Sequence, residues 1–379
     1  FRNHSENPDI FANAVTPEGT VLWGSDGKPI STESRKQTGP RLTPDGVGGV
    51  YIVWKDEHTA SFPETEIFLQ RVSASGEISF PENGLAVCEA PSHQFGPIVR
   101  KDSDGGSFVV WGDTRTGSIG INLQHVDQSI GNTLEQDGIE VFWGVDGNSY
   151  FPESVRIDDE QTLIYWKDER KGSSYSQIYG QIINSNFSNM ELINGTVLSE
   201  RPGQIEPTVV KAGNHLFLQF NGENDEGTRI QYYQILDLDL NMVGDTNGTV
   251  IYENLATQNQ EFSVVTTGND GFVYVAFSDT RWYDLDIYVQ KYSEIGEPQW
   301  QEGGIAVGAL EADDVIESIV PGPDEGCIIV WANGSWLGID LYAQAIDGSG
   351  NTRDGWSEVA TVISNWNSDQ SNSQLHTTN

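Results

Sequence analysis

The stretch "FSDTRWYDLDIYVQKYSEIGEPQWQEGGIAV", residues 277–307, contains in order most of the elements that recur along this chain of 379 residues. An aromatic residue closes an apolar run, an Asp-x-Arg triplet follows, and a second apolar run ends in Gln. A glycine turn and a weaker apolar segment complete the stretch. Short apolar runs separated by turn residues are typical of antiparallel strands. The stretch therefore predicts consecutive strands of one antiparallel sheet.

The residue that ends the second run recurs with nearly constant spacing. Its copies lie 53 to 57 residues apart, at Asn13, Gln70, Gln124, Gln181, Gln234, Gln290 and Gln344. The closing aromatic residue keeps the same period, at Trp54, Trp111, Trp166, Phe220, Phe277 and Trp331. Each unit has room for four strands, and four strands at this period are the signature of propeller blades. The sequence predicts an all-β fold, a β-propeller with four-stranded blades of about 55 residues.

The number of blades follows from the repeat count. Seven copies of the Gln-type segment but only six complete inner hairpins are present, which predicts a seven-bladed propeller in one domain, residues 1–379, with one blade split. We expect residues 1–37 to form the outer half of the split blade. Residues 365–379 would begin its inner half or form a linker, and the remainder would come from outside this sequence. The six complete blades are expected at 38–90, 91–144, 145–200, 201–254, 255–309 and 310–364.

Loop lengths indicate where a ligand would bind. The run before the aromatic residue is apolar almost throughout, so we expect it to be the second strand, buried on both faces. The hairpin that contains it has nearly constant length, whereas the loop after the aromatic residue varies. In an up-and-down blade this loop shares one end of the sheet, here called the variable face, with the blade-to-blade loop. Because function concentrates on loops held by a rigid frame, we expect binding at the variable face.

Composition excludes several classes of protein. The chain has 56 acidic and 20 basic residues, a formal charge of −36, which argues against binding nucleic acid or an anionic membrane surface. No apolar segment approaches the roughly 18 residues of a membrane helix, so no membrane insertion is expected. Cys88 and Cys327 occupy different phases of the repeat. We expect both to be free and mostly buried.

The Asp-x-Arg triplet has two interpretations. An Asp and an Arg two residues apart can point the same way along an extended chain. The guanidinium can then bind its own Asp, a loop carbonyl or an Asp of the next blade. Repetition favours a structural tie between blades, because function resides in specific sites. The alternative is a ring of charged groups that binds a polar polymer such as a glycan. Its residues would be Asp56, Asp113, Arg115, Asp168, Arg170, Asp279, Arg281 and Trp282.

The combined pattern of W-x-D-x-R, D-I-Y-x-Q, a Gly turn and a Trp resembles a known group of propeller repeats. These occur in large secreted proteins of Bacteroidota-type bacteria, many of them cargo of the type IX secretion system. The resemblance covers essentially the whole chain, although Phe220–Asn224 and Trp331–Ser335 depart from it. It implies an extracellular or cell-surface location and does not indicate an activity. No C-terminal sorting domain is visible in the sequence.

A catalytic alternative rests on histidines at the variable face. His4, His58, His93 and His376 fall at phases that would place them on one sector, together with Arg2 and Arg115. A His base with an Arg that neutralises a carboxylate could abstract a proton in a polysaccharide lyase. Solvated loop histidines are the simpler explanation. The acidic charge also disfavours a polyuronate substrate.

Calcium is the one cofactor that the sequence suggests. Oxygen-rich loops suit this ion, but none of the acidic loops matches an EF-hand. The candidate ligands are Asp225, Glu226, Asp313, Asp314 and Asp347. Solvated turns explain the same residues equally simply.

These observations favour a secreted or cell-surface propeller that binds or adheres to glycan or protein ligands at its variable face. The alternatives are a carbohydrate-active enzyme, a lyase or a glycoside hydrolase, and a structural domain of a larger surface protein or secretion complex. No nucleophile elbow, P-loop or zinc-binding His pair occurs, so the sequence favours binding over catalysis.

Overall fold

A computed structural model describes most of the chain. The described residues are 8–16, 19–57, 64–143, 147–185, 187, 195–224, 227–252, 260–281, 285–308, 313–323, 325–335, 338–357 and 360–364. The chain divides into two compact units. Unit 1 comprises residues 1–173 and 179–196, and unit 2 comprises residues 174–178 and 197–379. Each unit is described by itself.

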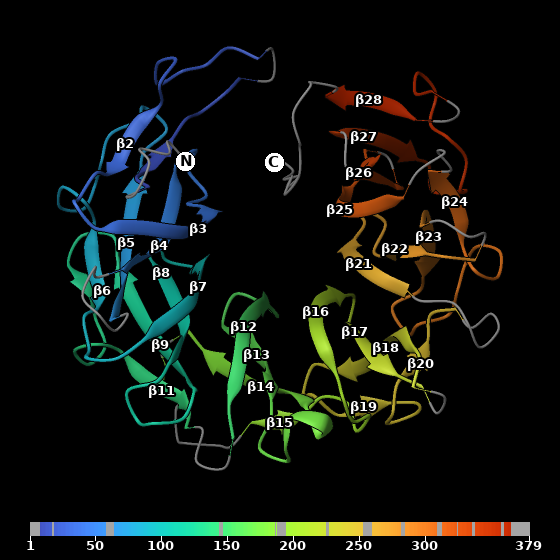
Figure 1. The fold of residues 1–379 in the computed structure, drawn as a ribbon, viewed down its shortest axis with the longest axis horizontal. Coiled ribbons are helices and arrows are strands. Elements are labelled where there is room, and N and C mark those ends of the chain that lie inside the picture. Colours follow the sequence, from blue (N-terminus) through green and yellow to red (C-terminus); the bar gives the residue numbers. More distant parts are fainter. Residues whose placement is uncertain are drawn as a thin grey trace. The chain divides into compact units, whose positions relative to one another are not determined.

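Unit 1 is a series of antiparallel sheets whose strands follow one another in sequence order (Figure 1). It starts with the pair β1 (Ile10–Ala12) and β2 (Lys28–Ser31). The next sheet contains β3 (Lys36–Pro44), β4 (Val50–Glu57), β5 (Thr65–Val72) and β6 (Leu85–Cys88). The following one contains β7 (Gln94–Lys101), β8 (Ser107–Asp113), β9 (Gly120–Asp127), β10 (Gly131–Asn132) and β11 (Ile139–Phe142). The last contains β12 (Ser149–Arg156), β13 (Gln161–Asp168), β14 (Gln177–Asn184) and β15 (Thr196–Val197), of which the end of β15 and the start of β14 belong to unit 2.

Unit 2 repeats this plan. Its first sheet contains β16 (Ile205–Ala212), β17 (His215–Glu223), β18 (Arg229–Asp237), β19 (Met242–Val243) and β20 (Thr249–Val250). The second contains β21 (Gln260–Thr267), β22 (Val273–Asp279), β23 (Asp286–Tyr292) and β24 (Ile305–Gly308). The third contains β25 (Asp314–Pro321), β26 (Cys327–Ser335), β27 (Gly338–Ile346) and β28 (Thr361–Ser364).

The structure confirms the all-β fold of repeated antiparallel sheets with four strand positions. In two sheets the outermost strand is interrupted, so that β10 and β11 both pair with β9, and β19 and β20 both pair with β18. Among the described residues, the one helical element is a single 3₁₀ turn, η1 (Ser173–Tyr175). No helix in the described part of the chain has the length and apolar character to span a bilayer.

The second strands are largely buried, as their apolar sequence predicted, and third strands such as β23 are buried as well. Every residue of β8 and of β22 is buried. Four of the closing aromatic residues stack on an aromatic residue of the third strand, as Trp54 does on Phe68 with 6.1 Å between ring centroids. Trp166 stacks instead on Phe142 of the preceding sheet. Neighbouring sheets share these side chains, since Tyr51 of β4 and Trp111 of β8 belong to one apolar cluster. Each such side chain contributes roughly 1.5–3 kcal/mol through burial.

The recurring Gln holds the turn between the third and fourth strands. Gln70 accepts hydrogen bonds at Oε1 from the backbone N–H groups of Arg71 and Phe80, each at 2.9 Å, and donates from Nε2 to the carbonyl of Pro81 at 2.9 Å. Gln124 and Gln290 bond in the same way. This buried amide satisfies backbone groups that lack a ladder partner at the turn, which explains why Gln keeps the period.

Each sheet has two ends that carry different loops. The loop between the second and third strands and the connection to the next sheet lie at the variable face. The turns between the first and second strands and between the third and fourth strands lie at the opposite end, here called the turn end. Both cysteines are free and buried, as expected, and burial raises the pKa of Cys88 to about 12 and also raises that of Cys327.

Candidate functional site

The Asp-x-Arg triplet at the variable face ties together strands of its own sheet and also contacts the preceding sheet. Arg281 donates from Nε to Asp279 Oδ1 (3.1 Å) and from Nη2 to Asp279 Oδ2 (3.2 Å). Its Nη1 donates to the carbonyl of Gly303, in the turn before β24, at 3.1 Å. The guanidinium also lies 3.4 Å from the ring centroid of Tyr288 on β23. One arginine therefore joins β22, β23 and the start of β24.

Two further copies make the same tie. Arg115 Nη2 donates to Asp113 Oδ2 (2.6 Å) and to the carbonyl of Asp137 (2.9 Å). Arg170 Nη2 donates to Asp168 Oδ2 at 2.7 Å, and its guanidinium lies 3.9 Å from the ring centroid of Tyr179. Each arginine also contacts the preceding sheet, as the tie between blades requires. Arg115 Nη2 lies 3.1 Å from Cys88 Sγ at the end of β6, and the guanidinium of Arg170 lies 4.3 Å from the ring centroid of Phe142 on β11. Trp282 lies outside the described residues.

The carboxylates of all four copies point into the protein. Asp56, whose triplet has no Arg, is buried near the amide of Gln37, with 3.4 Å between Gln37 Nε2 and Asp56 Oδ2. Asp113, Asp168 and Asp279 are buried as well. Any contact with a ligand here would therefore involve the arginine edges.

Sequence reasoning missed a fourth arginine of this kind. The segment Phe220–Asn224 has no Asp-x-Arg, yet Arg201 occupies the equivalent place over Tyr232, 3.8 Å from its ring centroid. It donates to the carbonyls of Asn247 (3.0 Å) and Glu223 (3.1 Å). Arg201 comes from the connection before β16, a different part of the repeat. A motif search at fixed spacing therefore cannot find it.

Of the four histidines in the enzyme hypothesis, only His93 lies among the described residues. Its Nδ1 lies 2.9 Å from Thr65 Oγ1, and its ring stacks on Phe95 with 5.6 Å between centroids. Arg115, the arginine that could have neutralised a substrate carboxylate, is held in the tie described above. Arg2, His4, His58 and His376 lie outside the described residues, so their convergence stays a prediction.

The described calcium candidates have protein partners. Asp314 Oδ1 accepts from Asn333 Nδ2 at 2.8 Å, and Asp313 Oδ1 accepts from the backbone of Leu285 at 3.1 Å. Asp347 caps its own turn by accepting from the backbone N–H groups of Ser349 and Asn351. No group of three or more metal-ligating side chains occurs in the part of the chain that the structure describes. Asp225 and Glu226 lie outside that part.

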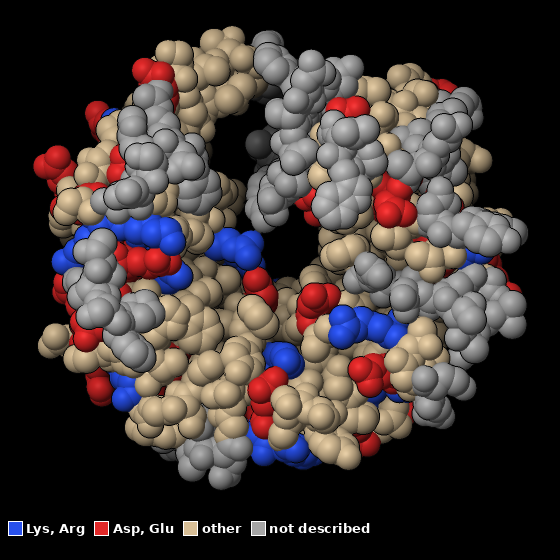
Figure 2. All heavy atoms as spheres, in the orientation of Figure 1, with Lys and Arg blue, Asp and Glu red and all other residues tan. Residues whose placement is uncertain are grey.

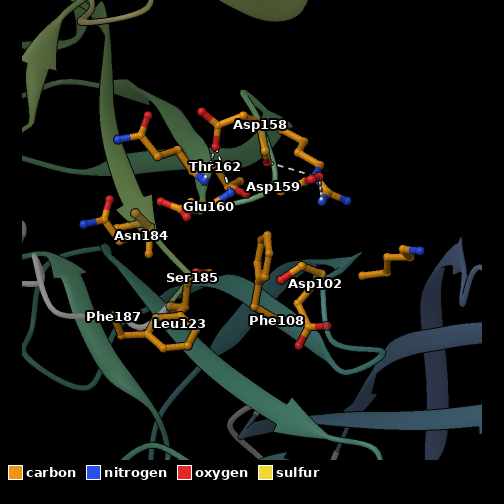
Figure 3. A pocket seen from close by; sticks show the side chains of 15 residues that line it. Asp102, Phe108, Leu123, Asp158, Asp159, Glu160, Thr162, Asn184, Ser185 and Phe187 are labelled. Carbon is orange, nitrogen blue, oxygen red and sulfur yellow. Dashed lines mark hydrogen bonds and ion pairs between the residues drawn. The ribbon is translucent and has the colours of Figure 1, made fainter.

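Unit 1 has a pocket at the turn end, between the sheet of β8 and the sheet of β13. The empty volume is about 420 Å³, part of which is open solvent at the mouth of the pocket. Its apolar lining consists of Phe108, Leu123, Ile183 and Phe187. Its polar lining consists of Lys101, Asp102, Ser103, Arg156, Asp158, Asp159, Glu160, Gln161, Thr162, Asn184 and Ser185. Figure 3 shows the turn residues Asp158, Asp159 and Glu160 opposite Phe108 and Asp102.

Phe187 occupies a backbone position that normally belongs to glycine. It follows Gln181 by the six residues that separate Gly76 from Gln70, and Gly296 from Gln290. The two glycines have φ values of +82° and +83°, and Phe187 has a φ of +54°. A bulky residue rarely adopts this left-handed conformation. The structure nevertheless places the phenylalanine ring in the lining of the pocket.

His125 supports Phe187 from the neighbouring sheet. Its ring lies 5.2 Å from that of Phe187, and its Nε2 lies 2.8 Å from Asp102 Oδ2. Burial raises the pKa of Asp102, but hydrogen bonds from His125 and from the backbone of Asp104 outweigh this and lower it. The His125–Asp102 contact has equivalents in other sheets.

In other sheets a permanent cation takes the place of His125. Arg71 lies 2.7 Å from Asp45, and Lys291 lies 2.8 Å from Asp270, in both cases between the turn Asp and the residue after the recurring Gln. The imidazole next to the pocket is therefore a variant of this tie. It is not an isolated catalytic group.

The pocket was not predicted, because sequence reasoning directed attention to the variable face. One signal was available, since alignment of the turn glycines would have singled out Phe187 as an aromatic residue in a glycine position. The opposing wall could not be found in this way. Phe108 contributes to it only because two successive sheets pack together.

No protein-family model matches the chain, and no curated protein matches it. Solved structures give distant likenesses. An α-L-arabinofuranosidase from Lactobacillus brevis is 12% identical over 69% of this chain and 93% of its own, with a TM-score of 0.37. A thermostable family-43 glycoside hydrolase is 13% identical over 69% and 92%, with a TM-score of 0.40. A protein of unknown function from Dyadobacter fermentans is 8% identical over 90% and 86%, with a TM-score of 0.46. With TM-scores below 0.5, these likenesses carry no argument about function.

Proposed function

We propose that this chain is an extracellular glycan-binding module, and that the pocket at the turn end of unit 1 takes one sugar unit of the glycan. The observation that carries the proposal is Phe187. Holding a non-glycine residue in the left-handed region costs on the order of 1–3 kcal/mol. Glycine fills the same turn at Gly76 and Gly296, so the fold does not require this cost. Leu240 also holds a positive φ there, of +67°, but its side chain is buried in the core, whereas Phe187 lines the pocket. An aromatic surface for a ligand explains why it is retained.

The lining of the pocket suits a pyranose ring. Phe187, Phe108 and Leu123 offer an apolar surface against which the C–H face of a sugar can pack. Asp158 and Asn184 offer carboxylate and amide groups that can bond to hydroxyls. Ligand sites typically combine an apolar lining with a few well-placed polar groups.

The arrangement favours binding over turnover. Asp159 is paired with Arg156 at 2.6 Å. Asp158 Oδ1 accepts from the backbone N–H groups of Glu160 and Gln161, each at 2.8 Å. These carboxylates are held as hydrogen-bond acceptors. Glycoside hydrolysis needs one carboxyl group that acts as an acid and a second that acts as a base or nucleophile. The contacts of Asp158 and Asp159 do not support such a division of roles.

The proposal includes a seven-bladed ring. Six sheets with four strand positions account for six blades, and β1 with β2 would be the outer half of the seventh. The resemblance to secreted Bacteroidota repeat proteins supports an extracellular or cell-surface location, export by the type IX system and membership of a larger surface protein. The acidic charge suits a soluble extracellular module.

A glycan array probed with the complete chain, followed by calorimetric titration of the best oligosaccharide, tests the proposal. Phe187→Gly should lower the affinity roughly tenfold, because the stacking surface is lost. The melting temperature should stay equal or rise, because strain at the turn is relieved. Chromatography of the incubated oligosaccharide detects any released product and so distinguishes binding from turnover.

The matched control is Ile130→Ala. Ile130 is also an exposed apolar residue near a turn of unit 1, with 77% of its surface exposed, but it does not line the pocket. Its replacement should leave the affinity unchanged. Equal binding by the wild type and by Phe187→Gly would overturn the assignment of the pocket, and cleavage of the oligosaccharide would favour the enzyme alternative.

A further inference from the structure

The first strand of several sheets contains a bulge at an equivalent position. In β12 the register shifts between Tyr150 and Glu153, and Phe151 within the bulge has a φ of +54°. In β3 and β7 the same position, immediately before a proline, is Gly39 and Gly96, with φ values of +61° and +57°. A side chain added at either glycine would meet no atom within 4 Å. Where a proline follows, the bulge thus has a left-handed backbone, and glycine adopts this without strain.

Phe151 adopts this conformation with a large aromatic side chain that stays in solvent. Its exposed fraction is 64%, so the ring gains little from packing inside the protein. Strained backbone is concentrated at binding sites, and here the strained residue also has an exposed aromatic ring. We propose that Phe151 is the stacking platform of a second glycan-binding site, at the variable face of unit 1, and that its ligand is a neutral hexopyranose chain.

The surroundings of Phe151 extend the aromatic surface. The ring of Tyr150 lies 6.0 Å from that of Phe151, at an interplanar angle of 35°. Lys167, paired in register with Tyr150 on the neighbouring strand, lies 5.5 Å from the Tyr150 ring centroid. Two rings with polar groups beside them match a saccharide, which presents apolar C–H faces and hydroxyl edges together.

Two cations near this platform are paired with carboxylates, and a third, Arg41, acts electrostatically on the carboxylate of Glu153, which favours a neutral ligand. Lys167 Nζ lies 2.8 Å from Glu169 Oε1, and Arg100 Nη2 lies 3.4 Å from Glu153 Oε2. Figure 2 shows a similar distribution of charge: on the face drawn there, most basic side chains lie next to acidic ones. A polyuronate or a sulfated glycan would need unpaired cations, and these four groups supply none.

The platform is separate from the pocket at the turn end. Phe151 lies near the start of β12, whereas Arg156, which lines the pocket, ends that strand. Five residues of extended strand span roughly 17 Å. The inference therefore does not depend on ligand binding in the pocket, and the two sites can be tested independently.

Titration of the complete chain with neutral hexasaccharides of glucose, galactose and mannose tests the inference. Phe151→Gly should lower the affinity for the preferred hexasaccharide roughly tenfold and should raise the melting temperature, because it removes the ring and the strain together. Phe151→Ala removes the ring but keeps a side chain in the left-handed region. It should lower the affinity equally without that rise in melting temperature.

Glu206→Gly is the matched control. Glu206 precedes a proline in β16 and has a φ of +53°, so this change relieves the same strain in another sheet. It should leave the affinity unchanged. Phe187→Gly, measured in parallel, reports on the pocket alone. Undiminished hexasaccharide binding by Phe151→Gly, preference for a charged glycan, or binding of a protein at Phe151 in place of any glycan would each overturn the proposal.

Discussion

The guanidinium of Arg281 replaces the hydration that the buried carboxylate of Asp279 has lost. The side chains are 8% and 0% exposed, the most enclosed of the described Asp-x-Arg pairs. Removal of one partner from such a pair leaves a buried charge without compensation. We expect Arg281→Ala to lower the free energy of unfolding by roughly 3–5 kcal/mol, measured by urea denaturation.

A surface ion pair provides the comparison. Arg156 and Asp159 are bonded at 2.6 Å, but most of the Asp159 side chain is in solvent. Exposed pairs of this kind contribute about 0–1 kcal/mol, so Arg156→Ala should change the urea midpoint little. Similar effects of the two substitutions would show that the Asp-x-Arg tie is not a principal source of stability.

Glu57 makes part of the stability of unit 1 depend on pH. Burial alone would raise the pKa of Glu57, but hydrogen bonds from Lys55 and Lys36, with the charge of Lys55, lower it to about 2 from an ordinary value of 4.5. A lowered folded-state pKa stabilises the fold above the unfolded-state value, and this contribution disappears as the pH falls through the folded-state value.

The corresponding prediction compares the wild type with Glu57→Gln. The wild type should be more stable by about 1–2 kcal/mol above roughly pH 4.5, and the difference should vanish as the pH approaches about 2. Urea denaturation at a series of pH values measures this. A difference that is constant from pH 7 to pH 2 would contradict the assigned ion pairs.

Among the sheet elements, the turn between the third and fourth strands depends on the buried Gln. Gln70→Leu keeps the approximate size of the side chain but leaves the backbone N–H groups of Arg71 and Phe80 without their acceptor. Unsatisfied groups of this kind cost roughly 1–3 kcal/mol. Amide hydrogen exchange at Phe80 should accelerate in the variant. Gln128→Leu, in the exposed turn after β9, is the control and should leave exchange at Phe80 unchanged.

The strands were predictable because each depends on its own residues. An aromatic residue closes the second strand, and a Gln in the third strand bonds to the following turn. Both residues act within their own sheet, so they recur at a regular spacing in the sequence. The position of Arg201 was not predictable, because the same stack on an aromatic ring can be reached from another segment. The pocket also escaped prediction, because Phe108 and Phe187 meet only through the packing of two sheets.

The molecule as a whole carries a charge of −36, which sets how its stability responds to salt. Self-repulsion among like charges destabilises a compact state, and salt shortens its range to about 10 Å at 0.1 M. We expect the melting temperature to rise as NaCl increases from about 0.02 to about 0.5 M. A melting temperature independent of salt would contradict this account.

The same experiment tests for calcium. Calcium and magnesium chloride at equal ionic strength screen charge equally, so a larger rise with calcium would indicate a specific site. The acidic loop that contains Asp225 and Glu226 is the candidate, and Asp225→Asn with Glu226→Gln should then remove the difference. Equal effects of the two ions would remove the reason to invoke calcium.

Each unit contains one buried thiol whose reaction with an alkylating reagent can report the opening of that unit. Cys88 belongs to unit 1 and Cys327 to unit 2. Since only the thiolate reacts with alkylating reagents, neither cysteine can be labelled at neutral pH until its unit opens. Mass spectrometry of chains labelled for increasing times would therefore measure two opening rates in one protein without substitutions, and would show whether the two units open at the same time or one after the other.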